Sequence, residues 1–129
     1  MFNLNFFKTT KRKIPLKKKD KLNLEKILKR EIKKENSDIK EINIVMVGRE
    51  RIKRINKNFL GKNKKTDCIS FNLGEIGEIY ICSDFVKNKK DFLKLIIHSF
   101  YHIMGYDHKN NHERIKMEER EKRLLNKLI

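Results

Sequence analysis

Three of the chain's four histidines lie in one short stretch, HSFYHIMGYDH, which runs from residue 98 to residue 108. His98 and His102 are four residues apart, so on a helix both rings project from the same face. Gly105 stands where such a helix should end, because glycine tolerates the left-handed conformation that reverses the chain. His108 can then fold back toward the other two rings. This spacing predicts a metal site formed by His98, His102 and His108.

Three imidazole ligands favour zinc, with the fourth tetrahedral position left to water, as in catalytic zinc sites. Nickel, iron or copper would also suit these ligands. Because the ligands are neutral, the site keeps the full charge of the ion, which suits an anionic substrate and lowers the pKa of bound water. We therefore expect one Zn²⁺ per chain, with His98, His102 and His108 acting in catalysis through the metal-bound water.

The residue after the first histidine separates two classes of metal enzyme. Metzincin proteases carry the pattern H-E-x-x-H-x-x-G-x-x-H, in which the glutamate is the general base. This chain has every histidine and the glycine of that pattern, but Ser99 takes the place of the glutamate. A serine hydroxyl cannot usefully accept a proton near neutral pH. A metzincin-like metallopeptidase is thus an alternative function against which Ser99 counts.

The stretch HSFYHIMGYDH closely resembles the signature H-G-x-L-H-L-x-G-Y-D-H of the YbeY-type bacterial endoribonucleases. KTDCISF (65–71) resembles the P-T-D-V-L-S-F strand of that family, and GEIYIC (77–82) resembles its G-D-I-x-I strand. The run from Ile55 to Gly61 is similar to its N-x-x-[YF]-R-G segment, and the whole match covers about residues 43 to 125. The resemblance implies a zinc ion on the three histidines and a small fold with a cleft between sheet and helices.

The resemblance also implies a function. It predicts a cytoplasmic, zinc-dependent, single-strand-specific endoribonuclease that acts in ribosomal RNA maturation and ribosome quality control. The expected partners are ribosomal RNA and ribosome-associated proteins, with no membrane attachment and no small-molecule cofactor.

Leu60 is the main departure from the family, which usually has an arginine at this position in the cleft. A leucine cannot bind phosphate. Lys62 and Lys64 are close enough in sequence to substitute, although lysine lacks the bidentate fork of arginine. A non-catalytic, ribosome-associated RNA-binding module with a structural metal is therefore a second alternative.

Charge along the chain is zoned. The net charge is +16, from 33 basic and 17 acidic residues, but the chain has no Ala, Gln or Trp, so part of the lysine excess can reflect biased amino-acid usage. Residues 51–65 carry seven basic and no acidic side chains, which indicates a polyanionic partner there. The candidate RNA-binding residues are Arg51, Arg54, Lys62, Lys64 and Lys65.

Three further polar residues are candidates for supporting the metal site. Asp67 and Ser70 lie on the strand that, by resemblance, borders the cleft, and Asp107 precedes the last histidine of the motif. A carboxylate can orient a ligand histidine by accepting the hydrogen of its second ring nitrogen. Asp67 could equally cap a turn, and Asp107 has the same ambiguity. His112 could shuttle protons or be merely exposed.

Periodicity predicts the elements that position these residues. We expect strands over 2–7, 42–47, 66–73 and 78–82, and helices over 22–34, 49–59, 92–104 and from 110 to the C-terminus. Asp91 is the expected N-cap of the metal-bearing helix, and Asn110 with Glu113 resembles a capping box. The pattern predicts one α+β domain over residues 1–129, with a small mixed sheet of about four strands packed with helices and a metzincin-like metal-bearing helix.

The two cysteines provide a test of strand pairing. An antiparallel hairpin with Asn72 opposite Glu78 would place Cys68 opposite Cys82 on one side of the sheet. We expect both to be reduced thiols, because no export signal is visible in the sequence.

Overall fold

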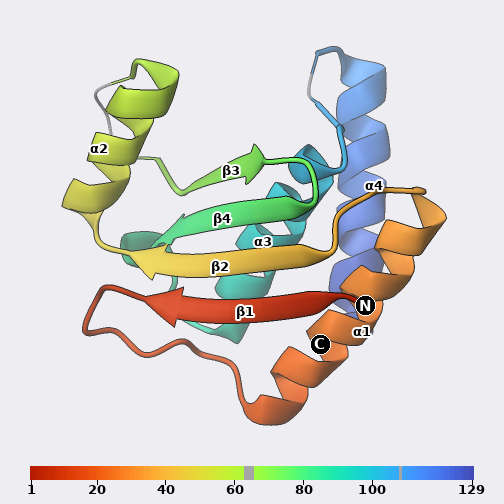
Figure 1. Cartoon of the computed structure of the whole chain (residues 1–129), viewed down its shortest axis with the longest axis horizontal. Helices are drawn as coiled ribbons and strands as arrows, with labels where there is room; N and C mark the ends of the chain where they lie inside the picture. Colours follow the sequence, from red (N-terminus) through yellow and green to blue (C-terminus); the bar gives the residue numbers. More distant parts are fainter. Residues whose placement is uncertain (63–65, 108) are drawn as a thin grey trace.

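A computed structural model describes residues 1–62, 66–107 and 109–129, in which a sheet is packed with helices on both faces (Figure 1). The order of elements is the expected one: β1 (Asn3–Lys8), α1 (Lys18–Lys34), β2 (Glu41–Val47), α2 (Arg49–Leu60), β3 (Cys68–Asn72), β4 (Ile76–Cys82), the 3₁₀ turn η1 (Ser83–Phe85), α3 (Lys89–Ile103) and α4 (Asn111–Leu128).

The sheet has four strands in the order β1-β2-β4-β3. β1 and β4 are both parallel to β2, whereas β3 is antiparallel to β4 and forms one edge. The predicted α+β class and the small mixed sheet are therefore confirmed. Parallel strands need a crossover connection, and α1 makes the one between β1 and β2.

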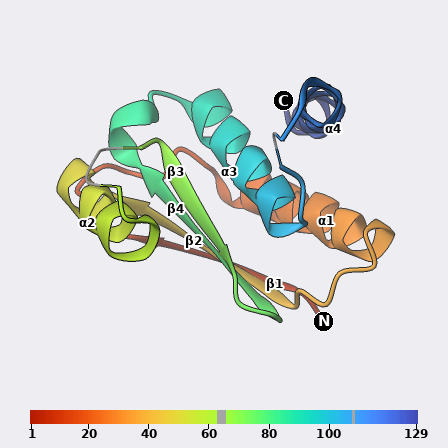
Figure 2. The same ribbon diagram turned by 90° about the horizontal axis from the view of Figure 1, so that it is seen from above.

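Alternating side chains supply two separate cores. Ile42, Ile44 and Met46 of β2 pack into the larger core, which α1, α3 and α4 also line. Val47 of β2 belongs to a smaller core on the other face, where Ile52 of α2 packs with it. Figure 2 shows this division, with α2 on one side of the sheet and the other three helices on the opposite side.

The β3–β4 hairpin forms, but its register differs from the expected one by one residue. Cys68 lies opposite Ile81 and Asn72 opposite Gly77. The cause is the turn, which needs only two residues: Leu73 donates to the carbonyl of Ile76 at 2.8 Å, and Gly74 between them has φ +94°.

A slip of one residue moves side chains to the opposite face of a sheet. Cys68 accordingly packs against the larger core, while Cys82 belongs to the smaller one. The prediction that the two cysteines face each other is wrong. Neither cysteine, both in described strands, forms a disulfide.

Helix α3, which carries His98 and His102, begins three residues before the expected start. Its N-cap is Asn88, not Asp91: the Asn88 side chain accepts from the backbone N–H of Asp91 at 2.9 Å. The Asp91 carboxylate instead accepts from the backbone N–H of Lys87 at 3.0 Å. At the start of α4 the predicted cap is present, because Asn110 accepts from the backbone N–H of Glu113 at 2.9 Å.

The C-terminal half of α3 is held tightly against the hairpin. Gly77 of β4 has no side chain, and a Cβ built there would lie 3.0 Å from Cδ1 of Ile103. The Asn72 side chain also donates to the carbonyl of Ile103 at 3.0 Å. Phe100, which is fully buried, anchors the same half in the larger core. These contacts fix the helix face that carries His98 and His102.

Candidate metal centre

The rings of His98 and His102 face each other from successive turns of α3. Their Nε2 atoms are 3.1 Å apart, and their planes meet at 85° with centroids 4.6 Å apart. Two nitrogens bound to one tetrahedral zinc at about 2.0–2.1 Å would be separated by about 3.3 Å. The pair thus has nearly the geometry of two adjacent zinc ligands.

The hydrogen bonds of the two Nδ1 atoms determine whether each Nε2 carries a hydrogen or a lone pair. Nδ1 of His102 lies 3.0 Å from the backbone carbonyl of Tyr106, which can only accept, so this Nδ1 carries the hydrogen. Nδ1 of His98 lies 2.7 Å from Oε1 of Glu121, and an ionised carboxylate also only accepts. In neutral rings both Nε2 lone pairs then point at each other, and a cation between them removes the repulsion. The donor set fits a metal ion.

Glu121 is also the main electrostatic influence on His98. Its hydrogen bond raises the pKa of His98 above the usual value, while partial burial of the ring acts in the opposite direction. The negative charge of Asp67 adds to the increase. The side chains of His98 and Glu121 are 32% and 23% exposed, so the pair lies at the surface of a pocket, not in the core.

The turn after α3 orients His102. Tyr106 donates its backbone N–H to the carbonyl of Tyr101, and Gly105 donates to that of His102, both at 3.0 Å. These two bonds, with Gly105 at φ +100°, form a Schellman motif. The Tyr101 and Tyr106 rings pack edge to face with centroids 5.4 Å apart. The same turn places the Tyr106 carbonyl next to Nδ1 of His102. The motif that ends α3 therefore also orients the His102 ring.

The third expected ligand, His108, lies outside the described residues. Within 1–62, 66–107 and 109–129, no group of three or more His, Cys, Asp or Glu side chains is placed to hold a metal ion. The structure therefore brings together two of the three predicted ligands, and the role of His108 stays a prediction.

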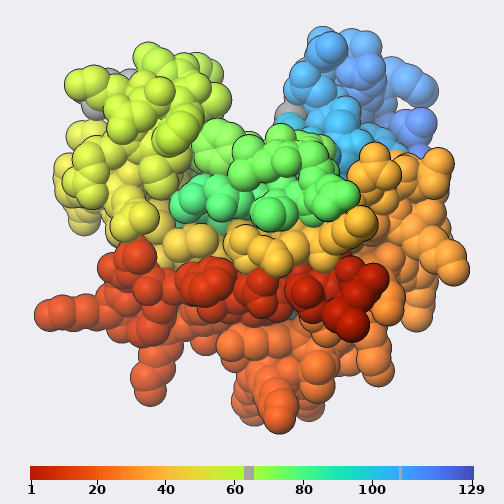
Figure 3. All heavy atoms as spheres, in the orientation of Figure 1, coloured from red at the N-terminus to blue at the C-terminus, as the bar shows by residue number. Residues whose placement is uncertain are grey.

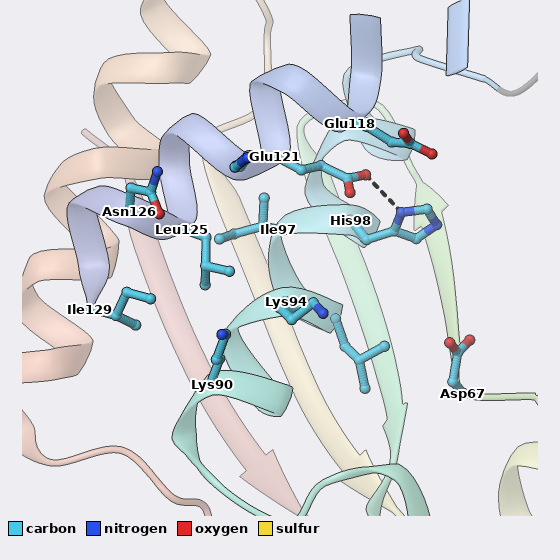
Figure 4. A pocket seen from close by; sticks show the side chains of 12 residues that line it. Asp67, Lys90, Lys94, Ile97, His98, Glu118, Glu121, Leu125, Asn126 and Ile129 are labelled. Atoms are coloured by element: carbon cyan, nitrogen blue, oxygen red, sulfur yellow. Dashed lines mark hydrogen bonds and ion pairs between the residues drawn. The ribbon is translucent and has the colours of Figure 1, made fainter. Parts of the chain in front are cut away.

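Of the three described residues expected to support the metal site, only Asp67 lines the pocket that contains His98 (Figure 4). The Oδ1 atom of Asp67 accepts from the backbone N–H of the next residue, Cys68, at 2.8 Å. Ser70 is half-buried on β3, and Asp107 is exposed after the Schellman turn. The carboxylate that contacts His98 is Glu121, which the motif did not indicate. Glu121 is ten residues into α4, and only the packing of α4 on α3 brings it to the ring.

The two tyrosines of the motif are structural. Tyr101 is fully buried and donates its hydroxyl to Glu31 at 3.2 Å. Tyr106 donates its hydroxyl to Glu35 at 2.9 Å. Both tyrosines therefore tie the motif to α1 and to the residue that follows it. His112 is exposed at the first turn of α4.

The basic residues of the middle zone lie on and after α2. Arg51, Arg54 and Lys62 are exposed, as is Leu60 at 53%, whereas Lys64 and Lys65 lie outside the described residues. Figure 3 shows α2 and the beginning of α4 rising on either side of a hollow that β3 floors. Helix α2, which carries Arg51 and Arg54, therefore forms one wall of this hollow.

A pocket of about 520 Å³ lies between α3 and α4, with His98, Glu121 and Asp67 among its lining residues (Figure 4). This volume falls in the range of small-molecule sites. Among the described helices, none has a stretch apolar and long enough to span a lipid bilayer.

Comparison with known proteins agrees with the fold. A solution structure of a protein from Thermotoga maritima has a TM-score of 0.61 and 26% identity, covering 97% of this chain and 88% of that one. A relative named Endoribonuclease YbeY from Chlorobaculum tepidum is 33% identical over 138 aligned positions, which cover 97% of each chain.

A relative of the same name from Thermotoga maritima is 35% identical over 98 residues, which span 67% of this chain but only 65% of that protein. The sequence model described as Endoribonuclease YbeY matches residues 6–129. The chain therefore belongs to the endoribonuclease YbeY family.

Proposed function

We propose that the protein is a zinc-dependent endoribonuclease that cuts single-stranded RNA. In this proposal it acts in the cytoplasm on ribosomal RNA, in maturation and quality control, together with ribosome-associated proteins. The observation that carries the proposal is the pair of imidazole Nε2 atoms 3.1 Å apart, with each Nδ1 occupied by an acceptor. The names of the relatives supply the reaction.

His98, His102 and His108 would hold the ion. Bound zinc supplies a Lewis acid that polarises a phosphoryl oxygen and brings the pKa of water near neutrality. Glu121 and the Tyr106 carbonyl keep the two described rings in the tautomer that turns Nε2 inward. The chain's own contribution is thus a pair of fixed, correctly protonated ligands.

Arg51 and Arg54 on α2, with Lys62, Lys64 and Lys65 beyond it, would hold the RNA backbone. Their charge opposes that of phosphates, and the described members are exposed. Leu60 stands in the same segment and offers no hydrogen bond. This feature favours the second candidate function, an RNA-binding module with a structural metal and little or no nuclease activity.

The peptidase alternative has weaker support. A serine hydroxyl is not a suitable general base near neutral pH. Ser99 is also only 1% exposed, so a substrate cannot reach it. The charge of the middle zone also suits a polyanion better than a polypeptide.

Metal analysis combined with an RNA-cleavage assay tests the proposal. Wild type should contain close to one zinc per chain and cut a single-stranded RNA, and His102→Ala should lose both properties. His112→Ala is the matched control, because it removes an exposed histidine and should change neither. Cleavage that persists in His102→Ala at the wild-type rate would indicate a contaminating ribonuclease and contradict the proposal.

A further inference from the structure

Helix α3 carries two lysines in line with the two histidines. Lys90, Lys94, His98 and His102 recur every four residues. Successive side chains at this spacing are neighbours on a helix, about 6 Å apart along its axis, and the row turns by about 40° at each step. The helix thus presents a row that begins with two cations and ends with the candidate metal ligands.

Lys90, Lys94 and His98 all line the pocket between α3 and α4. In Figure 4, Glu118 and Glu121 gather with His98 at one end, while Lys90 and Lys94 lie farther along α3. Two carboxylates of α4 therefore lie near His98, where a cation is expected, and Lys122 of the same helix also lines the pocket. The opposite end of the pocket is basic.

The wall between these ends is apolar. Ile97 and Leu125 line the pocket, with Ile129 at its far end (Figure 4). Ile129 is 58% exposed, so this surface is accessible to a ligand. Asn126 beside it carries an amide that can both donate and accept hydrogen bonds.

The two lysines are available for a ligand. Lys89, on the same first turn of α3, is 3.5 Å from the carboxylate of Asp20. For Lys90 and Lys94, by contrast, the described parts of the chain provide no ion pair, and both side chains are exposed.

We propose that this groove binds the nucleotides adjacent to the phosphate at the metal centre. The RNA backbone lies along α3, with successive phosphates at Lys94 and Lys90, and the base between them lies against Leu125 and Ile129. The inference rests on the proposed function and deepens it, because it gives the substrate strand a path along α3 in addition to the basic wall of α2.

The chemistry of the groove selects this occupant. An unstacked base needs an apolar surface and a hydrogen-bonding edge, and a phosphate needs a cation. The groove supplies both within one pocket of about 520 Å³. A duplex keeps its bases stacked and paired, so it cannot use the apolar wall.

Binding of a fluorescent hexauridine, followed by anisotropy over a range of salt concentrations, tests the backbone path. Each phosphate contact on a single strand contributes a slope of about −0.7 in log affinity against log salt. Lys90→Ala/Lys94→Ala should therefore flatten the slope by about 1.4 and weaken binding about fifteenfold near 0.15 M salt. Lys29→Ala/Lys127→Ala removes the same charge from exposed positions outside the groove and is the matched control.

A second comparison tests the base. Ile129→Ser should weaken binding of hexauridine but not of an abasic oligomer of the same length. Equal binding by the two lysine double variants, or equal loss on both oligomers, would overturn the inference.

If wild type cuts RNA while both predicted losses are absent, only the groove is refuted. If wild type neither binds nor cuts single-stranded RNA, the proposed function fails as well. Circular dichroism checks folding, which Lys→Ala changes on exposed helix positions should preserve, because alanine has the highest helix propensity.

Discussion

Replacement of Glu121 gives the most direct test of the candidate metal centre. Glu121 accepts from Nδ1 of His98 at 2.7 Å, a short, charge-assisted bond. Removing such a partner of a ligand histidine typically costs 10–100-fold in metal affinity, or about 1.4–2.7 kcal/mol. The two side chains are 32% and 23% exposed, so solvent screens part of the interaction. For Glu121→Gln we therefore expect a loss of about tenfold, at the lower end of that range.

Two companion variants separate charge from hydrogen bonding. Glu121→Ala removes the acceptor altogether and should cost more than Glu121→Gln, whose amide oxygen can still accept. Glu118→Gln makes the same change in charge in the same pocket, at an exposed residue one turn earlier on α4. We expect its zinc affinity to be close to that of wild type.

Competition of each purified protein with a chromophoric zinc chelator at fixed pH measures these affinities without reference to catalysis. The expected order of zinc affinity is wild type equal to Glu118→Gln, then Glu121→Gln, then Glu121→Ala. A Glu121→Ala protein with wild-type affinity would refute the reasoning. A loss of affinity in Glu118→Gln equal to that in Glu121→Gln would show that only the total charge of the pocket matters.

Three further predictions concern the rest of the chain. Leu60→Arg should speed RNA cleavage by about one to two powers of ten without changing zinc content, because a guanidinium at this position would add a charge-assisted hydrogen bond to a phosphate, worth about 1.5–3 kcal/mol. An unchanged single-turnover rate would contradict this. Gly105→Ala should lower the free energy of unfolding by about 1–2 kcal/mol, since φ is +100° at this residue. It should also weaken zinc binding, because the turn orients His102. Urea titration measures the first effect and chelator competition the second, and wild-type values in both would argue against this role of the turn. Burial of Glu31 raises its pKa, but interactions with Lys34, Arg123 and Tyr101 outweigh this effect and hold the pKa below its usual value. The ionised Glu31 carboxylate therefore stabilises the fold at every pH above the pKa that this group has in the unfolded chain. That stabilisation is lost as the pH falls through the lower pKa of Glu31 in the folded chain. Glu31→Gln should remove about 2 kcal/mol at neutral pH and flatten the acid limb of stability against pH, and an unaltered acid limb in urea titrations would contradict the assignment.

Much of the architecture could be predicted because local signals agreed with the fold. The β-branched run of β2 and the period of α2 gave these elements nearly their observed bounds. The spacing of His98 and His102 fixed their common face, since that depends only on helix geometry. By contrast, the hairpin register depended on whether the turn used two residues or three, and five residues with two glycines allow either.

Local sequence patterns could not predict contacts between elements that are distant in sequence. Glu121 meets His98 across 23 residues, through the packing of α4 on α3. The prediction went instead to Asp107 inside the motif and to Asp67 and Ser70 of the strand expected at the cleft. The Tyr106 carbonyl was equally hidden, because a backbone group leaves no mark in the composition. The N-cap was missed for a simpler reason: Asn88 and Asp91 both suit that role, and the structure uses Asn88.

Tyr106 links the candidate metal centre to the C-terminal end of α1. Its carbonyl holds the His102 ring, and its hydroxyl reaches Glu35 just beyond α1, 71 residues away in sequence. Docking of the N-terminal helix and the pose of a ligand ring are therefore thermodynamically linked. A ligand that binds only the folded form of a site stabilises the contacts that hold the site in that form. We expect zinc to protect backbone amides of α1 from hydrogen exchange, although no residue of that helix would touch the ion.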